Sequence, residues 1–237
     1  MRFRTLAFSM ALVISCGSLA IPDRLAAQRI SSSDMSVFDA PGAGSAAGSG
    51  FGTFPLSINA GGTIVGHYTD ENDVSHGFLR TAGGEELVTF DAPGAGTAAG
   101  SGFGTFPRCI NASGVIVGHY TDAHNVSHGF VRSPHGKLGT FDAPGAGTAQ
   151  GSGFGTFPES INDAGVITGH YIDAQRVSHG FLRSASDGKF LTLDAPGASS
   201  TPGSGEGTFA RSIGTNGAIA GDYTDAHHVR HGFFWNQ

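Results

Sequence analysis

A histidine and an aspartate recur together in four copies of one short motif. The copies read HYTDENDVSHGFLR at 67–80, HYTDAHNVSHGFVR at 119–132, HYIDAQRVSHGFLR at 170–183 and DYTDAHHVRHGFFW at 222–235. In each copy the aspartate precedes the histidine by six residues across one short link. A carboxylate placed there can accept a hydrogen bond from the imidazole and fix its tautomer, as in a catalytic pair or a structural clasp.

Repetition favours the structural interpretation. A catalytic pair is needed once, whereas this pair is present in every copy, and buried polar groups must find partners. The predicted clasps are Asp70 with His76, Asp122 with His128, Asp173 with His179, and Asp225 with His231. On this interpretation none of these residues is catalytic.

A second set of residues offers ligands for zinc or iron. The four copies begin with His67, His119, His170 and Asp222. Three imidazoles and a carboxylate suit these metals, but bonds of about 2.0–2.2 Å require all four ligands to converge on one point. We expect them on the second strand of each unit, away from a shared centre. A metal ring is therefore the alternative, and we predict no metal and no other cofactor.

Internal periodicity decides the predicted fold. The aspartates at 39, 91, 142 and 194 recur at spacings of 52, 51 and 52 residues, so one unit of ~52 residues is written four times. The first unit has four short runs rich in β-branched and aromatic residues, at 53–59, 63–68, 75–80 and 86–92. Turn-compatible links join these runs, and a longer glycine-rich link at 42–55 precedes them. Each unit is expected to be a four-stranded antiparallel meander.

Four such sheets in sequence predict an all-β, four-bladed β-propeller. The segment HGFFWNQ at 231–237 resembles a third strand, and SVFDAPG at 36–42 resembles a fourth. Pairing this N-terminal strand with the last blade would close the ring and remove two unpaired edges. A β-solenoid or an open stack of repeats is the alternative. The predicted domain covers 36–237.

The first residues of the chain predict export. Arg2 and Arg4 precede an apolar stretch at 6–15, which is too short to span a bilayer and is typical of a signal peptide. We predict a signal peptide over 1–27, cleaved after Ala20 or Ala27, whereas the stretch 13–16 resembles a bacterial lipobox that would place a lipid on Cys16. The mature protein is then secreted, periplasmic or on the cell surface, with no transmembrane span.

Composition argues against nucleic acid as a partner. The chain has a net charge of −6, only two lysines and no basic cluster that could neutralise a run of phosphates. Apart from Cys16, the only cysteine is Cys109, whose counterparts in the other units are serines. Cys109 therefore fits a small slot in the fold and predicts no disulfide. We expect a monomer.

The repeats resemble a group of extracellular proteins, the HAF family. The resemblance is carried by the segments SINAGGTIVGHY followed by HGFLR, and by the terminal HGFFW. The family is named for a His-Ala-Phe motif after an I-N-x-x-G-x-V-V-G-like stretch. The resemblance covers all four units, although glycine replaces the family's alanine, as at Gly77, and Gly214 stands where the other units have asparagine. It implies a bacterial exported or surface repeat protein and brings no established activity.

One position varies between the units while its neighbours barely change. Its residues, on the first strand of each unit, are Leu56, Arg108, Glu159 and Arg211. We predict that they bind a ligand, with drift at solvent-exposed sites as the alternative. The favoured function is a non-catalytic secreted or surface binding module for an extracellular glycan or protein. The alternative is an extracellular glycan hydrolase or lyase at the mouth of the propeller channel, with Glu159 and Asp222 as its carboxylates.

Export can be checked by intact-mass measurement of the protein from its native host. We expect a chain that lacks at least its first 15 residues, because the charged start and the apolar stretch form a cleavable signal. An added diacylglyceryl group on Cys16 would select the lipoprotein route. A cytoplasmic species that retains Met1 would contradict the prediction.

Overall fold

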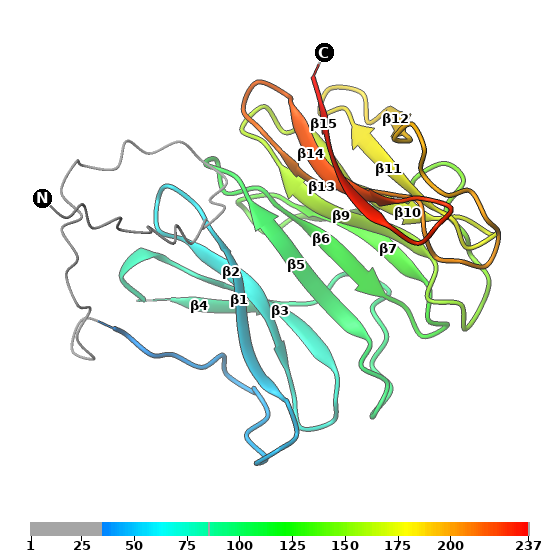
Figure 1. Ribbon diagram of the computed structural model, residues 1–237. Helices are drawn as coiled ribbons and strands as arrows, with labels where there is room; N and C mark the ends of the chain where they lie inside the picture. Colours follow the sequence, from blue (N-terminus) through cyan, green and yellow to red (C-terminus); the bar gives the residue numbers. More distant parts are fainter. Residues whose placement is uncertain (1–34, 85, 237) are drawn as a thin grey trace, which may run out of the picture.

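The computed structural model describes residues 35–84 and 86–236. The predicted signal peptide and Cys16 lie outside the described residues. Four β-units stand side by side in the order of the sequence (Figure 1). The described residues contain no helix with the length and apolarity that a membrane crossing needs.

Each unit is an antiparallel meander of short strands. The first unit has β1 (Gly52–Ile58), β2 (Ile64–Thr69), β3 (Ser75–Arg80) and β4 (Leu87–Phe90), with a 3-10 turn, η2 (Ala82–Gly84), before β4; the second has β5 (Gly104–Ile110), β6 (Ile116–Thr121), β7 (Ser127–Arg132) and β8 (Leu138–Phe141); the third has β9 (Gly155–Ile161), β10 (Ile167–Ile172), β11 (Ser178–Arg183) and β12 (Phe190–Leu193); the fourth has β13 (Thr208–Ile213), β14 (Ile219–Thr224) and β15 (Arg230–Trp235). These bounds confirm the prediction of repeated all-β hairpin units.

Apolar side chains fill the space between consecutive units. Ile110 and Ile116 of the second unit pack with Val65 and Leu79 of the first. Ile161 and Ile167 contact Val117 and Val131 in the same way, and Ile213 and Ile219 contact Leu182. The core is therefore a series of equivalent interfaces, as expected for a repeat protein.

Asparagine side chains connect the same interfaces. The amide of Asn59 donates to the carbonyl of Asn111 at 3.2 Å, that of Asn111 donates to the carbonyl of Asn162 at 3.1 Å, and that of Asn162 donates to the carbonyl of Gly214 at 3.3 Å. The side-chain oxygen of each asparagine also accepts an amide from its own turn, as from Val115 at 2.9 Å. One side chain thus holds a turn and fixes the position of the next unit.

The units do not close into a ring, so the prediction of a four-bladed propeller is wrong. The first three units form one open sheet, and β13–β15 form a separate three-stranded sheet. Figure 1 shows the first unit and β15 at opposite ends of the stack. The open repeat stack, named as an alternative, describes the arrangement, and there is no channel for β1, β5, β9 and β13 to surround.

The segment 36–42 lies on the first unit and not on the last. The amide of Ala40 donates to the hydroxyl of Thr53 at 2.9 Å, and the ring of Phe38 lies 6.0 Å from that of Phe78, under the guanidinium of Arg80. The fourth strands repeat this contact, because Phe90 of β4 packs in the same way on Phe130 of the second unit. A fourth strand therefore pairs its backbone with its own unit and packs its side chains on the following one. Counting strands by backbone pairing alone predicts a ring, because it does not show on which unit a strand's side chains pack.

A matched pair of glycines tests the contact between units. Gly104 and Gly52 have nearly the same backbone φ, 133° and 131°. A Cβ added at Gly104 would lie 1.9 Å from the carbonyl oxygen of Ser75, whereas a Cβ added at Gly52 would have its nearest neighbouring atom 4.0 Å away. We expect Gly104→Ala to lower the free energy of unfolding by about 1–3 kcal/mol more than Gly52→Ala. Urea titration measures both values. Equal losses would contradict this close approach.

Candidate binding surface

The varied position of each unit coincides with a β-bulge. Along the first strands the register skips Leu56, Arg108, Glu159 and Arg211, which have no partner residue on the neighbouring strand. A bulged residue is left out of the ladder and its side chain is re-aimed. Substitution there leaves the strand pairing intact, which explains how this position varies while its neighbours repeat.

Charged groups of alternating sign lie along this row. The guanidinium of Arg108 is 3.9 Å from the carboxylate of Glu159, and the guanidinium of Arg211 is 3.8 Å from the other oxygen of the same carboxylate. Arg211 also donates to Asp222 at 2.8 Å, and Arg230 lies 3.4 Å from Asp222. The predicted ligand-binding residues form a row along the stack and not a ring, with Leu56 as its apolar beginning.

The contacts around Glu159 are too long for direct hydrogen bonds. Burial raises the pKa of Glu159, while Arg108 and Arg211 act to lower it. The Nε of Arg108 and one carboxylate oxygen of Asp222 are buried and have no hydrogen-bond partner among the described residues. The groups of the row that a ligand could reach are the guanidiniums of Arg108 and Arg211, whose side chains are 37% and 43% exposed.

Beside the row, phenylalanine and histidine rings alternate in a column that crosses all the interfaces. His67 stacks on Phe54 with ring centroids 4.9 Å apart, and its other side meets the edge of Phe106 at 5.2 Å. The same alternation continues through His119, Phe157, His170 and Phe209 with centroids 5.0–5.1 Å apart. The column brings one aromatic pair from each unit into a single continuous contact.

The histidines of the column are neutral near pH 7. Burial, followed by the nearby guanidinium of Arg108, lowers the pKa of His67 to about 4. Burial, followed by Arg211 and Arg108, lowers the pKa of His170 to about 3, and burial holds the pKa of His119 well below its ordinary value. A positive charge on these rings would destabilise the stack.

The same column separates the residues of the alternative metal ring. His67, His119 and His170 are divided from one another by phenylalanine rings, and Asp222 is engaged by Arg211. In residues 35–84 and 86–236, no three histidine, cysteine, aspartate or glutamate side chains lie close enough together to hold a metal ion. Because these residues lie along a line, their side chains do not converge on one point as metal ligands must.

Each aspartate of the predicted clasps accepts hydrogen bonds from two backbone amides of its own turn. One carboxylate oxygen of Asp70 accepts the amides of Asn72 and Val74, both at 2.9 Å, and the other lies 3.7 Å from Nε2 of His76. The corresponding distances to the histidine are 3.6 Å for Asp122–His128, 3.4 Å for Asp173–His179 and 3.2 Å for Asp225–His231. The structure thus brings each predicted pair together, with the aspartate held by its turn.

The sequence interpretation missed a second aspartate at each of the first three histidines. Nδ1 of His76 donates to Asp91 at 3.0 Å, and His128 and His179 bond Asp142 and Asp194 at the same distance. These aspartates follow the fourth strands, and their regular spacing of about one unit was the available signal. Each of these histidines also stacks on a tyrosine at 5.0 Å, as His76 does on Tyr68.

The lowered pKa values predict a pH dependence of stability. Because the unfolded chain binds more protons at these histidines below about pH 6.5, the free energy of unfolding should fall as the pH is lowered from about 6.5 to about 4. His119→Leu should reduce this slope by up to about 1.4 kcal/mol per pH unit. Urea titrations at several pH values measure the slope, with the exposed His124→Ala as the control. An unchanged slope in His119→Leu would contradict a neutral, buried histidine.

Comparison with known proteins yields no family for this chain. No protein-family model matches it, and no curated protein matches it significantly. Its function must therefore be inferred from its own residues.

Proposed function

We propose that this chain is a non-catalytic, exported binding module that holds an extended glycan along the row of bulged residues. The observation that carries the proposal is the row itself. On the first strand of each unit, the residue that changes in size and charge is the one that the bulge leaves out of the strand pairing. The resemblance to the HAF repeats and the signal-like residues 1–27 support an extracellular setting.

The spacing of the charged groups favours a hydroxyl-rich ligand. Arg108 and Arg211 lie 3.9 and 3.8 Å from Glu159, so a sugar hydroxyl could accept from a guanidinium and donate to the carboxylate at the same time. The exposed side chains of Phe54 and Leu56 at the start of the row offer an apolar surface for the C–H face of a sugar ring. A linear glycan would meet equivalent positions as it passes from unit to unit.

Binding is favoured over hydrolysis by the position of Arg211. Its guanidinium lies between Glu159 and Asp222 and contacts both carboxylates. Glycoside hydrolysis needs an acid and a second carboxylate facing each other across the scissile bond. With the guanidinium between them, these two groups are arranged to hold polar ligand atoms.

A glycan array probed with the mature protein tests the proposal, followed by titration of the best glycan. Glu159→Gln and Arg211→Ala should each weaken binding about tenfold or more, since each removes a charged hydrogen-bonding group. Asp187→Asn changes an exposed carboxylate in a loop of the same unit as Glu159 and should bind like the wild type. Equal binding by all three variants would contradict the site. Release of reducing sugar from the bound glycan would favour the enzyme.

A further inference from the structure

The two ends of the stack carry complementary backbone edges. In the first unit β3 pairs with β4, so that Gly77 lies opposite Phe90. Among the described residues, β15 pairs only with β14, and its outer edge has no strand beside it. At the other end of the stack, the segment with the fourth-strand sequence leaves Met35 66% and Val37 88% exposed. Within residues 35–84 and 86–236, one end has no fourth strand beside its third, and the other end presents a fourth-strand segment.

A histidine and an aspartate at the two ends lack the partners that their counterparts have. His76, His128 and His179 each hydrogen-bond the aspartate after the fourth strand at 3.0 Å and lie 3.4–3.7 Å from the aspartate of the turn. For His231 the structure shows only the turn residue, Asp225, at 3.2 Å. Asp39 is the counterpart of Asp91, but its carboxylate accepts a hydrogen bond from the hydroxyl of Thr53 at 3.4 Å. Each end holds one half of the pair.

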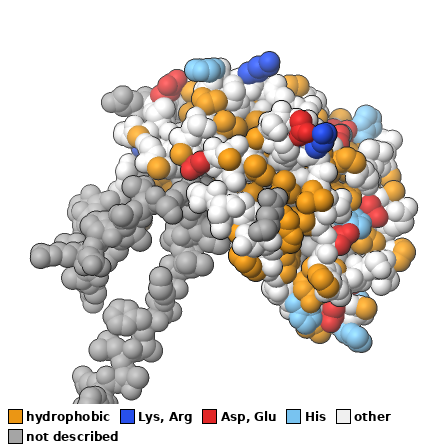
Figure 2. Space-filling view, turned by 90° about the horizontal axis from the view of Figure 1, so that it is seen from above, with side chains coloured by type: hydrophobic (Ala, Val, Ile, Leu, Met, Phe, Trp, Pro, Cys, Tyr) orange, Lys and Arg blue, Asp and Glu red, His pale blue; other side chains and the backbone are white. Residues whose placement is uncertain are grey.

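The apolar end faces are also two halves of the internal interface. Ile110 is 1% exposed against Val65 and Leu79, whereas its counterpart in the first unit, Ile58, is 46% exposed. At the other end the counterpart of Leu79 is Phe234, which is 71% exposed. Seen from above the view of Figure 1, the molecule shows a broad patch of hydrophobic side chains bordered by charged and histidine side chains (Figure 2). Terminal repeats usually have polar outer faces, because an apolar end favours association.

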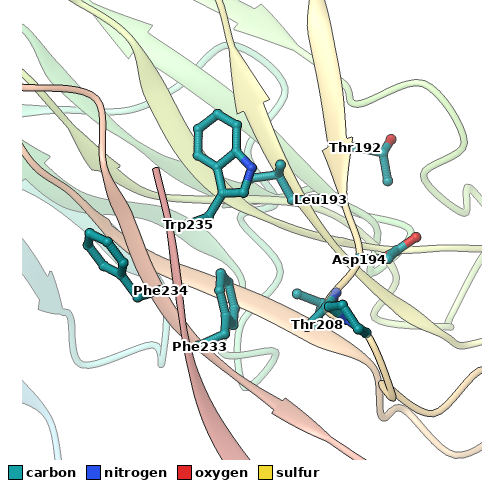
Figure 3. Close-up of a pocket in the computed structure, with 9 residues that line it drawn as sticks. Thr192, Leu193, Asp194, Thr208, Phe233, Phe234 and Trp235 are labelled. Atoms are coloured by element: carbon teal, nitrogen blue, oxygen red, sulfur yellow. The ribbon is translucent and has the colours of Figure 1, made fainter. Parts of the chain in front are cut away.

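A pocket marks the place of the missing strand. A cavity of about 220 Å³ lies between the end of β12 and β15, lined by Leu193, Asp194, Phe233, Phe234 and others. Phe233 and Trp235 lie on the side of β15 toward Leu193, and Phe234 lies on the other side (Figure 3). In the preceding units Phe190 of β12 packs 6.0 Å from Phe141 of β8. By the repeat, Leu193 corresponds to Phe141 and the exposed Met35 corresponds to Phe190.

We propose that copies of this chain associate head to tail. Residues 35–38 of one copy form the fourth strand beside β15 of another copy, and Asp39 bonds His231. The internal register then places Phe38 opposite Gly232 and Ser36 opposite Phe234 of the neighbouring copy. Met35 enters the pocket against Leu193, and Ile58 packs on Phe234. Because the two surfaces differ, each copy can bind one neighbour at each end, which builds chains or larger rings.

Two contacts of the internal interfaces are missing at this junction. Gly214 has no side-chain amide to continue the asparagine ladder, and Asp222 stands where a histidine would continue the aromatic column. The junction is therefore weaker than the internal interfaces, and the association is reversible and concentration-dependent.

A mixing experiment with the full chain tests the head-to-tail geometry. Ile58→Lys disables one end and Phe234→Lys the other, while Lys137→Glu in the second unit is the surface control. Sedimentation velocity should show concentration-dependent oligomers for wild type and control. Each end variant alone should have an association constant at least about tenfold lower than that of the wild type. An equimolar mixture of the two end variants should form dimers and nothing larger, because one intact surface of each kind remains. Wild type that stays monomeric at all concentrations, or oligomers that survive both substitutions, would overturn the proposal.

Cross-linking checks the register by a second measurement. In a background of Cys16→Ser and Cys109→Ser, Ser36→Cys and Phe234→Cys chains are mixed and oxidised. The expected product is a disulfide-linked dimer that contains one chain of each kind, identified by mass. When both substitutions are placed in one chain, a ladder of linked oligomers should form. A linked monomer would show closure within one copy, and dimers of identical chains alone would show a symmetric contact. Either result would contradict head-to-tail association.

Discussion

The packing of an isoleucine pair on the preceding unit is the interaction on which the rest of the structure depends. One meander alone is a small sheet with an apolar face that it cannot bury by itself. Ile110 and Ile116 cover Val65 and Leu79, and fully burying each such side chain contributes about 1.5–3 kcal/mol. The asparagine ladder and the close backbone approach at Gly104 then set how far one unit lies from the next. Stability is thus shared between neighbours along the stack.

The same stacking produces the candidate binding surface. A bulge in one strand would place a single charged residue at the surface of one unit. Repeated at a constant offset, the bulges align Arg108, Glu159 and Arg211 into a row, and the rings beside them align into a column. The pKa values of the column histidines are low because the phenylalanines of two units enclose each ring. The electrostatics of the surface therefore follow from the interfaces that stabilise the fold.

A stack of equivalent interfaces has two different ends. Each end carries one half of contacts that are complete inside the chain. At one end these halves are the open edge of β15, His231 with a single aspartate and the pocket beside Leu193, and at the other end the half is the exposed Ile58. A closed ring would join these halves within one molecule, and the open arrangement leaves them for a neighbour. The divergent residues of the last unit, Gly214 and Asp222, weaken the joint without removing its complementarity.

The sequence by itself determined the repeat length, the positions of the strands and the hairpins between them. These features are local, because β-branched and aromatic runs and turn residues act over a few neighbours. The pairing of Asp70 with His76 could be predicted for the same reason, since one tight turn brings the two together. The bulged positions were found through their variation, although nothing in the sequence indicated the bulge.

Only the tertiary structure decided what lies between units. Asp91 reaches His76 because β4 pairs with β3, and the segment 36–42 stays on the first unit because Phe38 packs on Phe78. Strand counting could not reveal this, since it records which backbones can pair and not which sheet a strand's side chains face. The choice between a ring and an open stack depends on the small rotation from each unit to the next. That rotation is set by the packing of isoleucine, asparagine and glycine contacts across every interface, and so it belongs to no single segment of the sequence.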